Sequence, residues 1–241
     1  LAVDGRDQER KKINYEYKLD RSSGREYNVH GTTNDILSML GLLEGVYKSY
    51  HPDYEADDTI YSVARALDFL FTKNKIDKDI YIYGNDRDLY QAIGGKVKVV
   101  KNFGKTKNKV ITGADIVDYD RVFNEYEVYP ENLAIYKALT GDSSDGLRGY
   151  YRFPKKFAAY LANNCTISED GMVVYEDELN PSQVKHYNDV KNNYTLFWKN
   201  YCVIRPKNYL FEIVKPDSGN AHKLITFYSM NSYRKEVGEL G

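Results

Sequence analysis

Eight acidic side chains stand in four short, separated clusters, and they are the residues of this sequence with the clearest chemical potential. They are Asp4, Glu55, Asp57, Asp58, Asp86, Asp88, Asp142 and Asp145. Carboxylates gathered at one spot must protonate or bind cations, because unbalanced charge is costly away from bulk water. Hard oxygen ligands suit Mg²⁺ or Mn²⁺. Two such ions, about 3.5–4 Å apart, can stabilise the attacking and leaving oxygens of a phosphodiester. The pattern therefore predicts a metal-dependent nuclease with two ions.

Each cluster taken alone also has an ordinary structural explanation. Acidic residues are common in the first turn of a helix, which suits the run at 55–58. The pair at 86–88 could lie in a plain turn, and the pair at 142–145 could cap a helix. What favours the metal site is that four such clusters occur together, three of them at expected strand ends or helix starts.

The elements that must position these clusters indicate an α/β fold. Strand-like runs stand at 1–3, 79–84 and 96–100, and the first two lead directly into Asp4 and the Asp86 cluster. In a largely parallel sheet, ligands bind beyond the carboxyl ends of the strands. Helices are expected at 34–47, after the 55–58 run, before Gly141, at 154–161, at 182–198 and at 221–230. We expect an α/β domain over 1–140 and a mostly helical region over 141–241.

Basic residues supply the complementary charge. The net charge is −1, so setting the eight clustered acids aside leaves a basic remainder, which suits a nucleic-acid surface around an acidic pocket. Residues 10–25 mix cations with tyrosines. Most of these cations fit a solvated loop, but we expect Arg10 and Lys18 to act at a phosphate, where they would offset developing negative charge.

The composition is that of a globular chain of 241 residues that is 42% hydrophobic. No apolar run is long enough to span a membrane, and the first ten residues do not resemble a signal peptide. The two cysteines, Cys165 and Cys202, form no CxxC motif, which fits a reducing cytoplasm. We expect a cytoplasmic monomer with no membrane partner.

Three motifs, YEADDTI, GNDRDLYQ and ALTGDSSDGLRG, resemble in order and spacing those of the 5′→3′ exonuclease/flap endonuclease family. This family includes phage exonucleases and the N-terminal nuclease domain of bacterial DNA polymerase I. The resemblance implies a PIN/FEN-like, largely parallel sheet with helices on both faces, followed by a helix–three-turn–helix (H3TH) region. It implies that all eight clustered acids are metal ligands, and that Lys18 and Arg10 lie near the cleaved phosphate. A helical arch would fall around residues 16–35.

Two segments depart from the family pattern. Family members carry an earlier strand with another metal-binding Asp, and this sequence starts after that point. The glycine-rich hairpin of the family reads here Gly149-Tyr-Tyr-Arg152-Phe-Pro154, so we expect weak or no potassium binding there. Side-chain charge would then replace backbone contacts to DNA. The expected DNA-binding residues are Arg21, Arg25, Arg148, Arg152, Lys155 and Lys156.

Together these patterns predict a divalent-metal-dependent 5′→3′ exonuclease or flap endonuclease that acts on duplex DNA in replication. An RNA–DNA hybrid is a further candidate substrate, and a polymerase or single-strand binding protein is a candidate partner. One alternative is a catalytically impaired subunit that only holds branched DNA. A weaker alternative is an RNA-cutting nuclease of the related PIN type.

Overall fold

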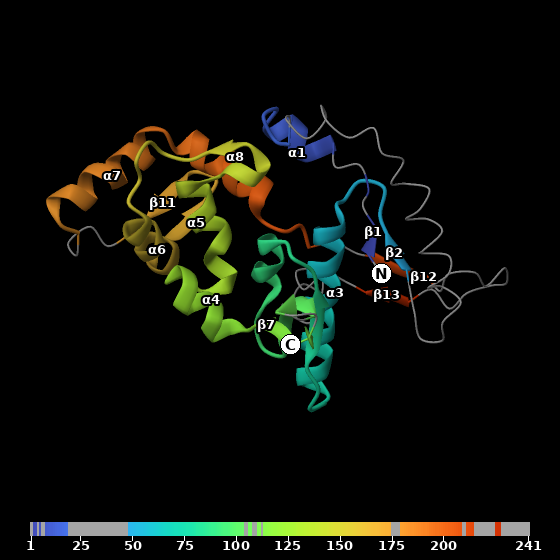
Figure 1. Ribbon diagram of the computed structural model, residues 1–241. Helices are drawn as coiled ribbons and strands as arrows, with labels where there is room; N and C mark the ends of the chain where they lie inside the picture. Colours follow the sequence, from blue (N-terminus) through green and yellow to red (C-terminus); the bar gives the residue numbers. More distant parts are fainter. Residues whose placement is uncertain are drawn as a thin grey trace, which may run out of the picture. The chain divides into compact units, whose positions relative to one another are not determined.

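The computed structural model describes residues 2–3, 5, 8–18, 48–103, 106–107, 110–111, 113–174, 179–208, 211–214 and 225–227. These residues belong to two compact units, whose helices and strands are labelled in Figure 1. The first unit comprises Leu1–Gln8, Arg21–Ile80 and Pro206–Gly241, and the second comprises Glu9–Asp20 and Tyr81–Arg205.

The first unit contains a four-stranded sheet in the order β1-β2-β12-β13. Its strands are Ala2–Val3 (β1), Lys48–Tyr50 (β2), Phe211–Val214 (β12) and Ile225–Phe227 (β13). β1 runs parallel to β2, whereas β12 runs antiparallel to both β2 and β13. One long helix, α3 (Ala56–Lys73), follows β2 and packs near this sheet.

Helix α3 has well-defined ends. At its start, Oδ2 of Asp58 accepts a hydrogen bond from the backbone N–H of Glu55 at 3.2 Å, which satisfies a donor that the helix itself cannot. At its end, the backbone N–H and the side-chain amide of Asn74 both donate to the Leu70 carbonyl. The expected helix after the 55–58 run is confirmed.

The second unit contains a three-stranded sheet in the order β3-β4-β7, made of Ile80–Tyr83, Val97–Phe103 and Ala114–Val117. Three further pairs are antiparallel: Thr106–Lys107 (β5) with Val110–Ile111 (β6), Gly141–Asp142 (β8) with Leu147–Arg148 (β9), and Thr166–Ser168 (β10) with Gly171–Val173 (β11). The helices are α1 (Gln8–Ile13), η2 (Arg87–Ala92), α4 (Tyr119–Tyr126), η3 (Pro130–Asn132), α5 (Leu133–Thr140), η4 (Ser143–Asp145), α6 (Lys155–Asn164), α7 (Pro181–Asn192) and α8 (Tyr194–Ile204).

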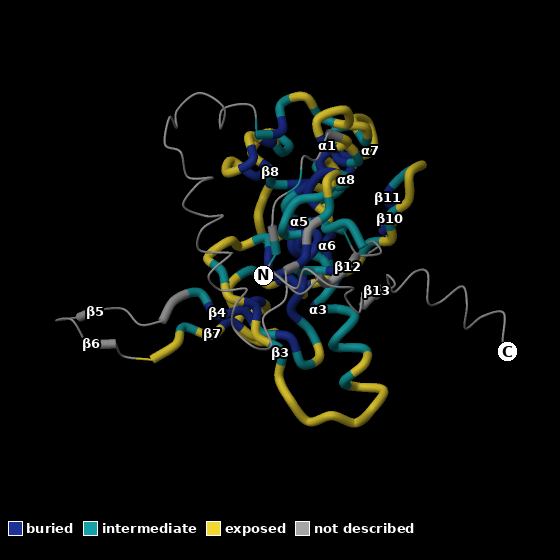
Figure 2. The backbone as a smooth tube through the Cα atoms, turned by 90° about the vertical axis from the view of Figure 1, so that its right-hand side faces the viewer, coloured by how far each residue is buried: buried dark blue, intermediate teal, exposed yellow. Residues whose placement is uncertain are grey.

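The core of the second unit lies where α5 packs against α6 and α8. Leu133, Leu139, Leu161 and Phe197 are almost completely buried there, and the buried stretches of these helices are dark blue in Figure 2. Burying four large apolar side chains stabilises the fold by about 1.5–3 kcal/mol each. This core fixes the C-terminal end of α5, from which the β8–β9 loop emerges.

The α/β class and the helical region after residue 140 are confirmed, but three details differ from expectation. Among the strand pairs whose register is described, only β1–β2 is parallel. The connection from β4 to β7 is too short for the crossover helix that a parallel pair needs. The expected helix at 182–198 is instead two helices, α7 and α8, which meet at Asn193. Strand β13 lies inside the expected helix at 221–230.

The remaining fold expectations fall largely on parts of the chain that are not described. The expected arch at 16–35 and the helix at 34–47 lie outside the described residues, except for 16–18. The domain boundary near residue 140 stays a prediction. In the part of the chain that the structure describes, no helix has both the length and the apolar character needed to cross a membrane.

Candidate metal centre

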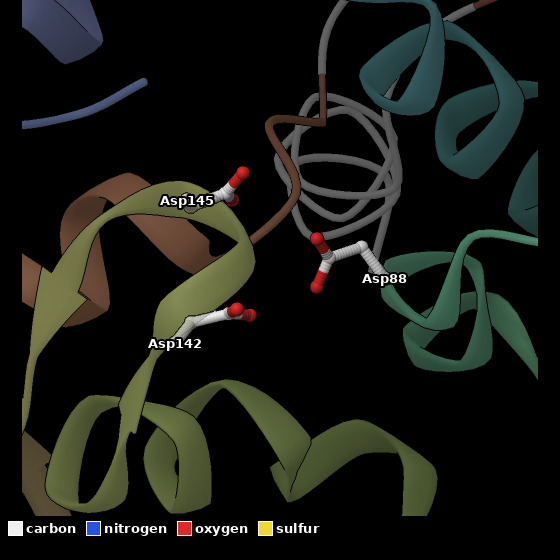
Figure 3. Close-up of side chains that lie close together, drawn as sticks. All are labelled: Asp88, Asp142 and Asp145. Carbon is white, nitrogen blue, oxygen red and sulfur yellow. The ribbon is translucent and has the colours of Figure 1, made fainter. Parts of the chain in front are cut away.

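Three of the eight predicted acidic residues meet in the second unit. Asp88, Asp142 and Asp145 each offer a carboxylate oxygen that lies within 4.8 Å of the other two. Asp88 comes from η2, whereas the other two come from the β8–β9 loop, and Figure 3 shows Asp88 pointing toward them from the opposite side. Residues separated by more than fifty positions in the sequence are therefore brought into one acidic cluster.

Local hydrogen bonds set the direction of these carboxylates. Asp86 caps η2, because its Oδ1 accepts the backbone N–H of Asp88 at 2.9 Å. Oδ1 of Asp142 accepts both the backbone N–H of Ser144 at 2.9 Å and its hydroxyl. These short-range contacts are the turn and cap interactions that each pair would make alone, and they also hold the acids in place for a shared site.

Two glycines allow the β8–β9 loop to close at its base. Gly141 and Arg148 are paired across β8 and β9, and Gly141 has a φ of 83°, which suits glycine. A Cβ added at Gly149 would lie 2.2 Å from the Thr140 carbonyl carbon, and one at Gly141 would lie 2.4 Å from the Gly149 nitrogen. Both ends of the loop that carries Asp142 and Asp145 therefore approach more closely than any larger residue would allow.

The Gly149→Ala substitution is therefore expected to destabilise the chain strongly, by about 2 kcal/mol or more, since backbone atoms must move to admit the methyl group. Gly171→Ala is the matched control, because a Cβ there meets nothing within 4 Å. Chemical denaturation of both variants measures the difference. Equal stability of the two variants would contradict the close approach.

Lys137 belongs to the acidic cluster and was not predicted from the sequence. Its Nζ lies 2.5 Å from Oδ1 of Asp88 and 2.9 Å from Oδ2 of Asp142, and its side chain is 13% exposed. It stands in the last turn of α5, in the otherwise apolar run LAIYKALT. The sequence feature that could have indicated Lys137 is a single cation in a largely apolar helix, five residues before Asp142.

The electrostatics of the cluster reflect burial opposed by Lys137. Burial raises the pKa of Asp88, and the charge of Lys137 only partly opposes this. Burial also acts to raise the pKa of Asp142, but hydrogen bonds and charge from Lys137 and Ser144 outweigh it and lower that pKa. Burial acts to lower the pKa of Lys137, and the two carboxylates raise it instead, so the ammonium stays charged.

The cluster gathers three carboxylates in a partly buried place, and the Lys137 ammonium contacts two of them, Asp88 and Asp142. The donors are hard oxygens from separate elements, and Mg²⁺ or Mn²⁺ accepts such donors readily. The residues present therefore fit a divalent cation, whose charge would favour the ionised form of Asp88 against the burial that raises its pKa.

The two expected catalytic cations have different surroundings. The backbone N–H of Lys18 donates to the carbonyl of Asp145 at 3.0 Å, and Lys18 adopts a φ of 53°. The predicted basic residue is thus attached to the acidic loop. Arg10 is 3% exposed, and its guanidinium donates to the carbonyls of Val203 and Arg205 at the end of α8. These contacts cap a helix, and the role of Arg10 at a phosphate stays a prediction.

The acidic residues of the first unit lie at the start of α3. Asp58 is fully buried, and its two oxygens accept the backbone N–H groups of Glu55 and Lys207, the latter at 2.7 Å. Glu55 and Asp57 are partly exposed. Asp4 lies outside the described residues. For all four, metal ligation stays a prediction.

Four of the six expected DNA-binding residues are described, and all four are exposed: Arg148, Arg152, Lys155 and Lys156. Arg152 has a φ of 51°, and its guanidinium carbon lies 5.0 Å from the centre of the exposed Tyr151 ring. Both lysines lie in the first turn of α6. Arg21 and Arg25 lie outside the described residues. All six stay predictions as DNA contacts.

Curated relatives of the chain are nucleases and polymerases. A 5′-3′ exonuclease of Mycoplasmopsis pulmonis is 28% identical over 151 residues, which are 62% of this chain and 44% of that protein. DNA polymerase I of Deinococcus radiodurans is 31% identical over 145 residues, 60% of this chain and 13% of that protein. The chain thus spans less than half the length of either relative. No protein-family model matches it.

Solved structures with the same fold come from bacteriophage T5. Its D15 flap endonuclease, in a complex with DNA and metal ions, has a TM-score of 0.56 at 16% identity and covers 84% of this chain and 71% of that one. The D15 protein crystallised with metal ions has a TM-score of 0.55 at 14% identity, with coverage of 84% and 73%. The chain is therefore related in sequence to 5′-3′ exonucleases and to DNA polymerase I, and it shares the fold of a flap endonuclease.

Proposed function

We propose that the chain is a divalent-metal-dependent 5′→3′ nuclease that hydrolyses phosphodiesters at the 5′ ends or flaps of duplex DNA, and that it serves DNA replication. The observation that carries the proposal is the meeting of Asp88, Asp142 and Asp145 in one acidic cluster. The relatives support it, since several are named 5′-3′ exonucleases.

Asp88, Asp142 and Asp145 would hold a divalent cation, Mg²⁺ or Mn²⁺, and Asp86 would keep Asp88 in position through the cap of η2. When bound, such an ion acts as a Lewis acid toward a phosphodiester. A second ion would use Glu55, Asp57 and Asp58 with Asp4, as the family resemblance implies.

The basic residues of the second unit would guide the substrate. Lys18, attached through its backbone to Asp145, would offset negative charge that develops on the phosphate during cleavage. Exposed cations at the start of α6, Lys155 and Lys156, would bind the duplex backbone, where contacts position DNA without reading its sequence. Tyr151 and Arg152 would stand beside them in place of a glycine-rich hairpin.

The proposal is tested with a 5′-flap DNA substrate, Mg²⁺ and the 241-residue chain. We expect cleavage that a chelator abolishes, and a loss of about a hundredfold or more in the Asp145→Asn variant, the scale of losing a charge-stabilising group. Asp170→Asn is the matched control, since it removes the same charge from an exposed turn between β10 and β11. Tight flap binding without cleavage in any of these conditions would instead support a non-catalytic branched-DNA-binding subunit.

A further inference from the structure

Asn200 of α8 is a fully buried polar residue that the proposed chemistry does not use. Its side-chain amide donates to the Arg148 carbonyl at 2.8 Å and to the Ala138 carbonyl at 3.3 Å. Within the described residues, its Oδ1 is buried with no hydrogen-bond partner. A buried, unsatisfied acceptor costs about 1–3 kcal/mol, so the contribution of this asparagine lies in the two hydrogen bonds that its amide donates.

The two carbonyls that Asn200 binds flank the acidic loop. Ala138 follows Lys137 in α5, and Arg148 ends β9. Between these two positions the chain carries Asp142 and Asp145. One amide group on α8 therefore joins both ends of the segment that carries Asp142 and Asp145. Lys137, whose ammonium contacts the clustered carboxylates, directly precedes Ala138.

Contacts of Gly141 and Gly149 also bring the two ends of the acidic loop together. Gly141 pairs with Arg148, and a Cβ on Gly149 would collide with Thr140. The glycines permit the two ends of the loop to approach, but they do not fix their spacing, because glycine has the least restricted backbone. A donor shared between two carbonyls does fix it, as each hydrogen bond is directional.

We propose that Asn200 is a positioning residue of the metal centre: by joining the carbonyls of Ala138 and Arg148, it sets the spacing of Asp142, Asp145 and Lys137 and thereby the affinity for a divalent cation. This inference rests on the proposed function, from which it takes the cation. Residues that orient metal ligands typically change affinity by about 10–100-fold when they are replaced.

The chain offers a matched control in Asn163. Its side-chain amide donates to the Glu127 carbonyl at 2.8 Å, and its Oδ1 accepts the backbone N–H of Tyr129 at 3.2 Å, so it also joins a helix to a neighbouring loop. Asn163→Ala and Asn200→Ala both remove an amide that binds backbone groups, and both are expected to lower the stability. Only Asn200 binds the ends of the acidic loop.

The experiment is calorimetric titration of Mn²⁺ into the 241-residue chain and into the Asn200→Ala, Asn163→Ala and Asp145→Asn variants, at a temperature where all are folded. We expect binding at least about tenfold weaker in Asn200→Ala than in the parent, and parent-like binding in Asn163→Ala. If Asn200→Ala does not fold, Asn200→Ser retains a short polar group and replaces it, with the same expected direction.

Equal Mn²⁺ affinity in Asn200→Ala and Asn163→Ala would overturn the positioning role while leaving the proposed function intact, provided that Asp145→Asn weakens binding. A parent chain that binds no Mn²⁺ would overturn both. The two failures are therefore distinguishable, because the first is a difference between variants and the second is a property of the parent.

Discussion

The Asp88→Asn substitution is expected to lower flap cleavage strongly and, in the same chain without metal, to raise the free energy of unfolding near neutral pH. Burial raises the pKa of Asp88, which means that its charged form is disfavoured in the folded state. Asparagine keeps the shape and removes that charge, and Lys137 retains its ion pair with Asp142. Cleavage is expected to fall by about a hundredfold or more, because a charge-stabilising site is lost.

The sign of the pH dependence follows from the direction of the pKa shift. A carboxyl group whose pKa is raised on folding contributes most stability when it is protonated, below its unfolded pKa of about 3.9. That contribution is lost as the pH rises through the raised pKa of the folded state. The stability advantage of Asp88→Asn is therefore expected to be greatest near neutral pH and to disappear as the pH falls below about 4.

Thermal unfolding in a chelator, from acid to neutral pH, measures this advantage, and the flap assay measures the loss of activity. Asp118→Ala gives the reverse pattern as a control: Asp118 caps α4, so its loss should cost about 1 kcal/mol and leave cleavage unchanged. A large loss of stability in metal-free Asp88→Asn would contradict this prediction, because it would show that the charged carboxylate of Asp88 stabilises the fold.

Replacing Lys137 with methionine is expected to destabilise the metal-free chain by about 3–5 kcal/mol, because it leaves two partly buried carboxylates without their counter-charge. A divalent cation can supply that charge. Mg²⁺ or Mn²⁺ should therefore stabilise Lys137→Met more than it stabilises the parent chain.

Unfolding midpoints with chelator and with Mn²⁺ test this directly. Lys199→Met removes an exposed lysine of α8 and should change stability by no more than about 0.5 kcal/mol in either condition. If the loss in Lys137→Met were the same with and without Mn²⁺, Lys137 and the cation would not share the carboxylates, and the acidic cluster would be a plain ion-pair network.

The sequence predicted that all eight clustered acids share one site, and of these the structure brings together Asp88, which follows a strand, and Asp142 and Asp145, which follow a helix. The sequence was also sufficient for α3 and for the helical region. Such features depend on local patterns: a capping acid, an apolar periodicity, a proline or glycine at an end.

Lys137 and Asn200 could not be predicted in the same way. Each is a single polar residue inside a largely apolar helix, and its meaning depends on which distant backbone or carboxylate packs against it. The contact of the Arg10 guanidinium with the end of α8, nearly two hundred residues away, likewise could not be predicted from the basic run in which Arg10 stands, and its role at a phosphate stays a prediction.

Strand direction was the other expectation that local patterns could not decide. The run at 96–100 predicts a strand, but β4 pairs antiparallel with β7 because the chain returns through a short connection. Likewise the apolar pattern at 182–198 runs across the junction at Asn193, where the Tyr150 hydroxyl donates to the Asn193 carbonyl at 2.7 Å. Tertiary contacts divide a helix that the pattern alone joins.

The most direct test of the central claim is an anomalous difference map from crystals of the chain grown or soaked with Mn²⁺. The account predicts a peak within coordination distance, about 2.0–2.3 Å, of carboxylate oxygens from Asp88, Asp142 and Asp145. A map with no peak there, in which Lys137 still bridges Asp88 and Asp142, would contradict it.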